Sequence, residues 1–332
     1  MNYFKLFANC INVRGATDSL IMDLQRESYL KIPSILSDVL EHTKKNISIN
    51  DIKEIFNHEY DKGIDEFFNY FVDNNYGFFT TTPELFPELN KNYITPFECL
   101  TSVICFEKES DYNLNDTLSQ LIDLGTQSVQ IRVSYSLTKK EIIKINNIFK
   151  KTRVKIVDLI IPYDSSYDLL LDNFNANNDR LHIYVLSSPI NRHYSNKYRL
   201  NIVYLKQAFE KYPSEIIKPY NFFVNYSFYN ESLAYNGGLN RKVSIDYDGG
   251  IKNYVDHEKV YGNVKFSKIC DIIVASDFMR KWHIHNDLIE KCKDCEFRYM
   301  CLNNSDIIAN NGKFFKLITC EYDPYNAKNN DE

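Results

Sequence analysis

The stretch Cys292-Lys293-Asp294-Cys295-Glu296-Phe297-Arg298-Tyr299-Met300-Cys301, followed later by Cys320, decides how the last part of this chain is organised. The four cysteines have the spacing C-x2-C-x5-C-x18-C. Closing the loop to the last cysteine costs about 2 to 3 kcal/mol of chain entropy. Structural metal binding by thiolates contributes about 10 to 16 kcal/mol, so the metal term prevails. We predict that Cys292, Cys295, Cys301 and Cys320 bind one metal centre.

A set of four thiolates is used by iron–sulfur clusters and by structural zinc. We expect one 4Fe-4S cluster, with zinc as the alternative. The remaining cysteines lie among apolar residues, where a free thiol usually fills the core as a small hydrophobic group. They are Cys10, Cys99, Cys105 and Cys270. Thiolates that are kept for a metal fit a reducing compartment.

The composition is that of an ordinary globular protein with two or three packed units, since 44% of the 332 residues are apolar and 25% are charged. No apolar run reaches the roughly 18 residues of a membrane span, and the N-terminus lacks a cleavage site for secretion. We therefore expect a cytoplasmic protein without a membrane partner. A net charge of −5 with no clustered stripe of Lys and Arg argues against a nucleic-acid partner.

Residues 1–95 have the pattern of a small unit of strands and helices. Three strand-like segments come first, at Tyr3–Val13, Ser19–Leu24 and Tyr29–Ile32. Three helical patterns follow, beginning at Pro33, after Ser48 as an N-cap, and over Asp61–Asn75. Gly77 ends the last helix before a strand-like Phe78–Thr81. Three strands, three helices and a wing strand predict a winged-helix domain.

Residues 96–238 follow a proline-rich linker and have a different rhythm. Apolar, β-branched runs occur at Ser102–Phe106, Ser128–Val133, Val154–Ile161 and Leu181–Leu186. Helical patterns separate them, at Leu114–Leu124, Lys139–Lys150 and Tyr167–Phe174. This alternation predicts an α/β fold with a parallel sheet. Because about five or six units fit in this length, we expect a shortened, partial (β/α) barrel.

Residues 239–325 form the predicted third domain, which ends with the cysteines. Alternating apolar residues predict a hairpin, with a strand over Arg241–Tyr247, the turn Asp248-Gly249-Gly250 and a return strand through Tyr254. A helix is predicted over Ser267–Trp282. Residues 326–332 have the composition of a disordered polar tail.

Four motifs precede the cysteine run, namely Asn240-Arg241-Lys242, Asp248-Gly249-Gly250-Ile251, Tyr261-Gly262-Asn263-Val264 and Trp282. Together with the run they resemble a SPASM domain, the iron–sulfur extension of radical SAM peptide maturases. Two further motifs lie at the ends, Tyr3-Phe4-Lys5-Leu6-Phe7 and Cys320-Glu321-Tyr322-Asp323-Pro324-Tyr325. With them the chain is similar to SPASM-domain maturases of grasp-with-spasm systems, which act with an ATP-grasp ligase.

The resemblance implies that the four cysteines hold the cluster called auxiliary II. The ligand positions of auxiliary cluster I are taken by Asn240, by Tyr254 or Val255, and by Asn304 or Ser305, so this cluster is not expected. The C-x3-C-x2-C motif that holds the AdoMet cluster is absent from the chain, and Ser134-Tyr135-Ser136 stands where the family has Gly-Gly-Glu. We therefore do not expect AdoMet to bind. The barrel is predicted to be a scaffold, with no catalytic residue assigned.

The N-terminal domain resembles the PqqD-like element that binds leader peptides of ribosomally made, modified peptides. The resemblance implies that an extended precursor peptide pairs with the edge strand Tyr29-Leu30-Lys31-Ile32. It also implies that the peptide packs on the third helix, beside Phe67 and Phe71. The alternative is a purely structural lid over the barrel.

Three functional hypotheses remain open at the level of sequence. The first is an accessory protein of peptide maturation, which binds the precursor peptide and leaves ligation to an ATP-grasp partner. The second is a working radical or electron-transfer enzyme that uses the C-terminal cluster for redox chemistry. The third is a binding module that is stabilised by zinc.

Overall fold

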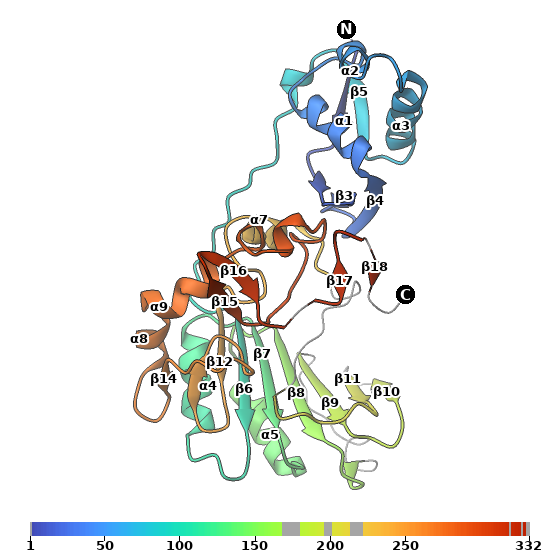
Figure 1. The fold of residues 1–332 in the computed structure, drawn as a ribbon. Coiled ribbons are helices and arrows are strands. Elements are labelled where there is room, and N and C mark those ends of the chain that lie inside the picture. Colours follow the sequence, from blue (N-terminus) through green and yellow to red (C-terminus); the bar gives the residue numbers. More distant parts are fainter. Residues whose placement is uncertain are drawn as a thin grey trace.

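The computed structural model describes residues 2–167, 180–195, 201–212, 222–318, 320–326 and 328–329. It is a mixed α/β structure with one large sheet, a smaller N-terminal part and a C-terminal segment that lies between them (Figure 1). In these described ranges, no helix is both long enough and apolar enough to cross a membrane.

Two small sheets lie in the N-terminal part. One is antiparallel with the order β2 (Cys10–Arg14), β3 (Asp18–Asp23) and β4 (Ser28–Pro33), and the other pairs β1 (Tyr3–Leu6) with β5 (Gly77–Thr80). The prediction of one strand over Tyr3–Val13 is therefore wrong. The chain turns between β1 and β2, because the N–H of Phe7 bonds to the Tyr76 carbonyl and the N–H of Cys10 bonds to the Phe7 carbonyl.

The N-terminal part contains three helices, as predicted. They are α1 (Ser34–Lys44), α2 (Ile49–Ile55) and α3 (Asp61–Asp73). Of these, α1 packs on the β2-β3-β4 sheet and α3 packs on β5. The predicted N-cap is confirmed, since Ser48 Oγ accepts the N–H of Asp51 at 3.2 Å. In the shared core, the ring of Phe4 stacks on that of Phe68 with 4.5 Å between centroids. A 3₁₀ turn, η1 (Pro83–Leu85), then opens the linker to the large sheet.

The large sheet has the order β10-β11-β9-β8-β7-β6-β12-β13-β14. Its strands are β6 (Thr101–Phe106), β7 (Ser128–Val133), β8 (Ile156–Pro162), β9 (Leu181–Leu186), β10 (Arg192–Ser195), β11 (Asn201–Tyr204), β12 (Lys242–Ile245), β13 (Gly250–Lys252) and β14 (Gly262–Asn263). All pairs from β12 to β11 are parallel, which confirms the predicted parallel sheet. Among the described strands, β10 and β14 are not paired with each other, so the sheet is open.

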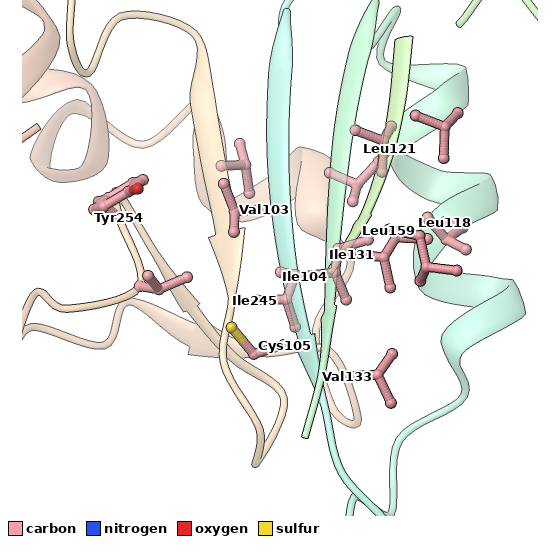
Figure 2. Packing of buried hydrophobic residues seen from close by; sticks show 14 of the residues in the cluster. Val103, Ile104, Cys105, Leu118, Leu121, Ile131, Val133, Leu159, Ile245 and Tyr254 are labelled. Carbon is pink, nitrogen blue, oxygen red and sulfur yellow. The ribbon is translucent and has the colours of Figure 1, made fainter. Parts of the chain in front are cut away.

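Two crossover helices pack on this sheet, α4 (Leu114–Asp123) and α5 (Lys139–Ile148), close to their predicted bounds. Figure 2 shows Leu118 and Leu121 of α4 lying against the sheet beside Ile131 and Leu159. The predicted helix Tyr167–Phe174 lies outside the described residues except for Tyr167. The hairpin is confirmed as β12–β13, and the other edge of β12 joins β6, so the sheet continues past residue 238.

The C-terminal part consists of short elements. They are α7 (Tyr226–Ser232), α8 (Ile269–Ile273), α9 (Ser276–Met279), the 3₁₀ turns η3 (Arg280–His283), η4 (Asn286–Leu288) and η5 (Cys292–Asp294), and the strands β15 (Ile307–Asn310), β16 (Lys313–Lys316), β17 (Tyr322–Asp323) and β18 (Lys328–Asn329).

Two sequence predictions are wrong in this part. The single helix over Ser267–Trp282 is interrupted at Ala275, whose ψ of 133° is extended. This break lets Phe278 pack edge-on against both Tyr261 and Trp282. The tail over 326–332 is not wholly disordered, because β18 pairs with β17, while residues 327 and 330–332 lie outside the described set.

Candidate metal centre and peptide-binding surfaces

Residues 286–325, here called the cysteine segment, begin with two 3₁₀ turns and carry all four predicted ligands. Lys291 has a φ of 68°, a left-handed conformation that is costly for a side chain with a Cβ, and it turns the chain directly before Cys292. The N–H of Cys295 then bonds to the carbonyl of Cys292 at 3.0 Å. This bond closes a tight turn between the first two cysteines of the run.

The four predicted cysteines influence one another electrostatically. Each is half-buried and none forms a disulfide. Electrostatic effects on their pKa values couple five thiol pairs: Cys292 with Cys295, Cys301 and Cys320, and Cys301 with Cys295 and Cys320. Such coupling acts only over short distances in a partly buried site. That the four thiolates bind one metal centre stays a prediction.

Burial governs the protonation of these thiols. It raises the pKa of Cys301 to about 12 and that of Cys295 well above its usual range, with neighbouring cysteines as smaller causes. The free thiols of Cys292, Cys295 and Cys301 are accordingly protonated at neutral pH, and metal binding by them would release their protons.

Lysines approach the thiols from β16 and from the turn before Cys292. Lys316 Nζ donates to the carbonyls of Asn303 and Ser305 at 2.9 and 3.3 Å. Its positive charge lowers the pKa of Cys292. Lys291 Nζ donates to the carbonyl of Cys320 at 3.1 Å. These ammonium groups favour thiolates, which is a fit for an anionic iron–sulfur cluster.

Within the described ranges, no group of three or more His, Cys, Asp or Glu side chains is arranged as the ligand set of a metal ion. A zinc ion would need all four sulfur atoms at about 2.3 Å from one point. A cluster core is larger than one ion and holds its thiolates further apart. An iron–sulfur cluster on Cys292, Cys295, Cys301 and Cys320 is therefore part of the proposal below.

The positions predicted to lack the other auxiliary cluster lie around a lysine. Lys242 Nζ donates to Asn304 Oδ1 and lies 5.1 Å from the centroid of the Tyr254 ring. The neighbouring His257 is buried, with Nε2 at 2.9 Å from the Asn304 carbonyl. Asn240 instead donates to Glu231 at 2.7 Å. The side chains at these positions are therefore held by hydrogen bonds and by the ammonium group of Lys242.

A charged cluster that sequence reasoning missed lies at the carboxyl ends of β7 and β12. Asp246 and Lys252 form an ion pair at 2.9 Å, with only 10% of each side chain exposed. Arg132 is buried and donates to the Glu210 carbonyl at 3.1 Å, while its Nε has no partner among the described residues. The only sequence signal was one polar residue at or after each strand. Cys99 and Cys105 are fully buried, as predicted for core thiols.

The predicted peptide edge is an edge of its sheet, because β4 pairs only with β3 among the described strands. Its side chains divide between two faces. Leu30 and Ile32 pack under the helices. Tyr29 packs edge-on against Phe297 of the cysteine segment, with 5.6 Å between ring centroids, and Lys31 Nζ lies 4.0 Å from Glu296 Oε1.

The predicted helix contacts lie in the core of the N-terminal part. Phe67 is 8% exposed and Phe71 is fully buried, and their ring centroids are 4.3 Å apart. In this arrangement both rings hold α3 against the sheet. Their predicted contact with a peptide stays a prediction.

The N-terminal sheet and the cysteine segment share a hydrophobic cluster. From the sheet it contains Val13, Leu20, Met22 and Leu24, and from the C-terminal half Tyr229, Phe297 and Met300. The approach is close at Gly15, where an added Cβ would lie 2.9 Å from the Glu296 carboxylate. The N–H of Ala16 also bonds to the Asp294 carbonyl at 2.8 Å. The cysteine run thus packs against the β2-β3-β4 sheet of the predicted peptide-binding domain.

No protein-family model and no curated protein matches this sequence. Among solved structures, the chain is similar to SuiB of Streptococcus suis bound to S-adenosylmethionine, with 11% identity and a TM-score of 0.34 over 91% of this chain and 94% of SuiB. A second SuiB structure gives 12% identity and the same TM-score over 90% of this chain and 94% of that one. These TM-scores are too low for the similarity to carry an argument about the site.

Proposed function

We propose that this chain is an accessory protein in the maturation of a ribosomally synthesised peptide. Its N-terminal domain binds the precursor peptide, the open sheet is a scaffold, and an ATP-grasp ligase carries out the chemistry. The observation that carries this proposal is the shared use of one loop. Residues 292–301 contain three of the four proposed ligands and also pack against the β2-β3-β4 sheet through Phe297 and Met300.

In this proposal, Cys292, Cys295, Cys301 and Cys320 hold one 4Fe-4S cluster. Bound there, the cluster supplies cross-linking of the loop and a centre for one-electron transfer, with all four thiolate positions filled by protein. Glu296 and Phe297 lie between these ligands in the sequence and contact Lys31 and Tyr29 of the edge strand. Binding of the cluster therefore also restricts the motion of the edge strand β4.

The β4 edge offers backbone groups for strand addition. The N–H of Leu24 bonds to the Asn9 carbonyl and the N–H of Gly15 to the Asp18 carbonyl, which fixes the hydrogen-bonded pairs between β2 and β3. By the alternation of an antiparallel ladder, the N–H groups of Tyr29 and Lys31 then point away from β3. An extended peptide can pair with these two donors.

The first test measures binding of synthetic short peptides encoded beside the gene to the full, iron-loaded chain by fluorescence anisotropy. Lys31→Pro removes an outward N–H without removing a bond to β3, and it should weaken binding about tenfold or more. The matched control is Lys31→Ala, which keeps the N–H. Equal affinity in the two variants would exclude strand addition at β4.

The second test separates the proposal from a radical enzyme. Iron-loaded, reduced protein is incubated with AdoMet, and the product is analysed for 5′-deoxyadenosine. We expect none, because a cluster with four thiolate ligands has no open iron for AdoMet. Stoichiometric formation of 5′-deoxyadenosine would overturn the accessory role, and colourless protein with one zinc would favour a zinc-stabilised module.

The third test concerns the ligase. An ATP-grasp protein encoded nearby should co-elute with this chain in size-exclusion chromatography when the precursor peptide is present. Separate elution of the two proteins at concentrations that saturate the peptide would contradict the proposed partnership.

A further inference from the structure

A cavity of about 630 Å³ lies along the other edge of the N-terminal sheet, beside β2. Its walls come from β1, β2 and α1, from linker residues 86–89 and 91, and from Tyr229, Arg298 and Tyr299. The volume is in the range of about 300 to 1,000 Å³ that is typical of ligand sites. Cys10, Ile11 and Asn12 all line it, although successive side chains of a strand point to opposite faces. The cavity therefore meets the edge of β2 and not one of its faces.

The β2 edge has unpaired backbone groups. The two bonds that fix the β2–β3 pairing make Ile11 and Val13 the bonded residues of β2. Cys10, Asn12 and Arg14 then point their N–H and carbonyl groups outward. The N–H of Cys10 bonds to the Phe7 carbonyl, and the carbonyl of Arg14 accepts from Arg298 Nη1 at 2.7 Å.

Four outward groups of β2 remain, namely the carbonyl of Cys10, the N–H and carbonyl of Asn12, and the N–H of Arg14. No described residue donates to them or accepts from them. The side chain of Asn12 is 7% exposed and its Nδ2 donates to Glu41 Oε1 at 2.7 Å, while its Oδ1 has no partner in the described part of the chain. A buried acceptor and a free strand edge in one cavity both indicate a hydrogen-bonding ligand.

The charge of the cavity selects an anionic ligand. Its lining contains Lys5, Arg14, Lys44, Lys91 and Arg298 against Glu41 and Glu88. The arginines are paired with carboxylates outside the lining, Arg14 with Asp38 and Arg298 with Asp287. Two of the lysines are paired within the lining, Lys91 with Glu88 at 2.8 Å and Lys44 with Glu41. Lys5 has only the neutral Asn46 as its hydrogen-bond partner among described side chains, which leaves positive charge in excess.

The other walls are apolar. Phe7 and Phe86 are exposed by 38% and 44%, although both are large hydrophobic side chains. They flank the cavity together with Phe78 and Leu89. A strand that adds to β2 would direct alternate side chains to the aromatic wall and to the lysines.

We propose that an extended peptide segment with acidic and apolar side chains adds to β2 as a further strand and fills this cavity. The inference rests on the proposed function only in that the ligand is a peptide. The site is separate from β4, since the two strands lie at opposite edges of the three-stranded sheet.

The experiment uses the full, iron-loaded chain and two fluorescein-labelled probe peptides. One alternates Asp or Glu with Leu or Phe, and the other carries Lys in place of each acid. We expect the acidic probe to bind, and its presence to slow hydrogen exchange of the Asn12 and Arg14 amides in the unmodified protein. Arg14→Pro, which removes one outward N–H, should weaken binding about tenfold relative to Arg14→Ala.

A second set of variants tests the positive charge of the cavity. Replacing Lys5, Lys44 and Lys91 with Gln together should reduce affinity for the acidic probe about tenfold and flatten its salt dependence. Lys62→Gln, on a side chain that is 90% exposed and outside the cavity, is the matched control. Equal binding of the acidic and basic probes, or unchanged exchange at Asn12 and Arg14 with the acidic probe bound, overturns the inference.

These outcomes distinguish the two proposals. Binding of an encoded peptide that is lost in Lys31→Pro but unchanged in Arg14→Pro supports the proposed function and contradicts this inference. Binding of the acidic probe that depends on Arg14 and the lysines, with no encoded peptide bound, supports the cavity site and contradicts the proposed function.

Discussion

The large sheet and the cysteine segment are held together by different forces. The sheet encloses a continuous cluster of buried apolar residues, including Ile104, Leu159 and Ile245 (Figure 2). In the cysteine segment, no described helix or strand is longer than four residues. So short a segment buries too little apolar surface to offset its chain entropy. The sheet is therefore stable through packing, and we predict that the segment depends on a metal bound by its cysteines in addition to the contacts of Phe297 and Met300.

The largest effect is expected from a ligand. Cys301→Ser should abolish the visible absorbance of the iron-loaded protein and cost on the order of 5 kcal/mol or more, because the cluster loses one of its anchors. Limited proteolysis should then cut within residues 286–325 while the sheet stays protected. The control is Cys270→Ser, which changes a half-buried thiol outside the four. Equal iron content and equal protection in both variants would contradict the comparison.

The next effect concerns the sheet. Lys252→Met leaves Asp246 as a buried, uncompensated charge and should destabilise the protein by about 3 to 5 kcal/mol in chemical denaturation. The visible absorbance of the folded protein should not change. The double variant Asp246→Asn/Lys252→Met should recover most of the loss. A bleached cluster in the single variant would show that the two regions are not independent.

A third effect depends on pH. Burial raises the pKa of Glu231 to about 7, against hydrogen bonding from Asn240, which lowers it. A raised carboxyl pKa contributes stability below about 4.5, and this contribution is lost as the pH rises through about 7. Glu231→Gln should therefore match the native chain near pH 5 and be about 1 to 3 kcal/mol more stable near pH 8.

The measurement is the free energy of unfolding in urea at both pH values. Glu59→Gln, at an exposed position, is the control and should be neutral at both. The same stability difference at both pH values would exclude Glu231 as the source. Glu231 accepts a hydrogen bond from Asn240, two residues before β12. The result therefore also tests how strongly this contact stabilises the start of β12.

The smallest effect is local to the N-terminal part. Ser48→Ala removes the N-cap of α2 and should cost about 1 kcal/mol. Neither the visible absorbance nor the stability of the large sheet should change, as followed by hydrogen exchange of β6 and β7 amides. Loss of exchange protection in those strands would mean that the N-terminal helices support the sheet.

Local rules explain what could be predicted from sequence. β7 and β9 have the predicted bounds, because runs such as Ser128–Val133 are apolar, β-branched and bounded by turns. The break at Phe7–Asn9 could not be predicted, since it depends on a hydrogen bond to Tyr76 far along the chain. The Asp246–Lys252 pair was equally hidden, because each residue alone is an ordinary polar residue at the end of a strand.

The sequence by itself determined the elements and the ligand candidates, because periodicity, capping and cysteine spacing are local properties of the chain. Only the tertiary structure decided that the cysteine run lies under the β2-β3-β4 sheet, and that a cavity follows the free edge of β2. Those arrangements arise from apolar surfaces of segments that are distant in sequence, which exclude water only when brought together. No local pattern encodes which distant surface will cover which.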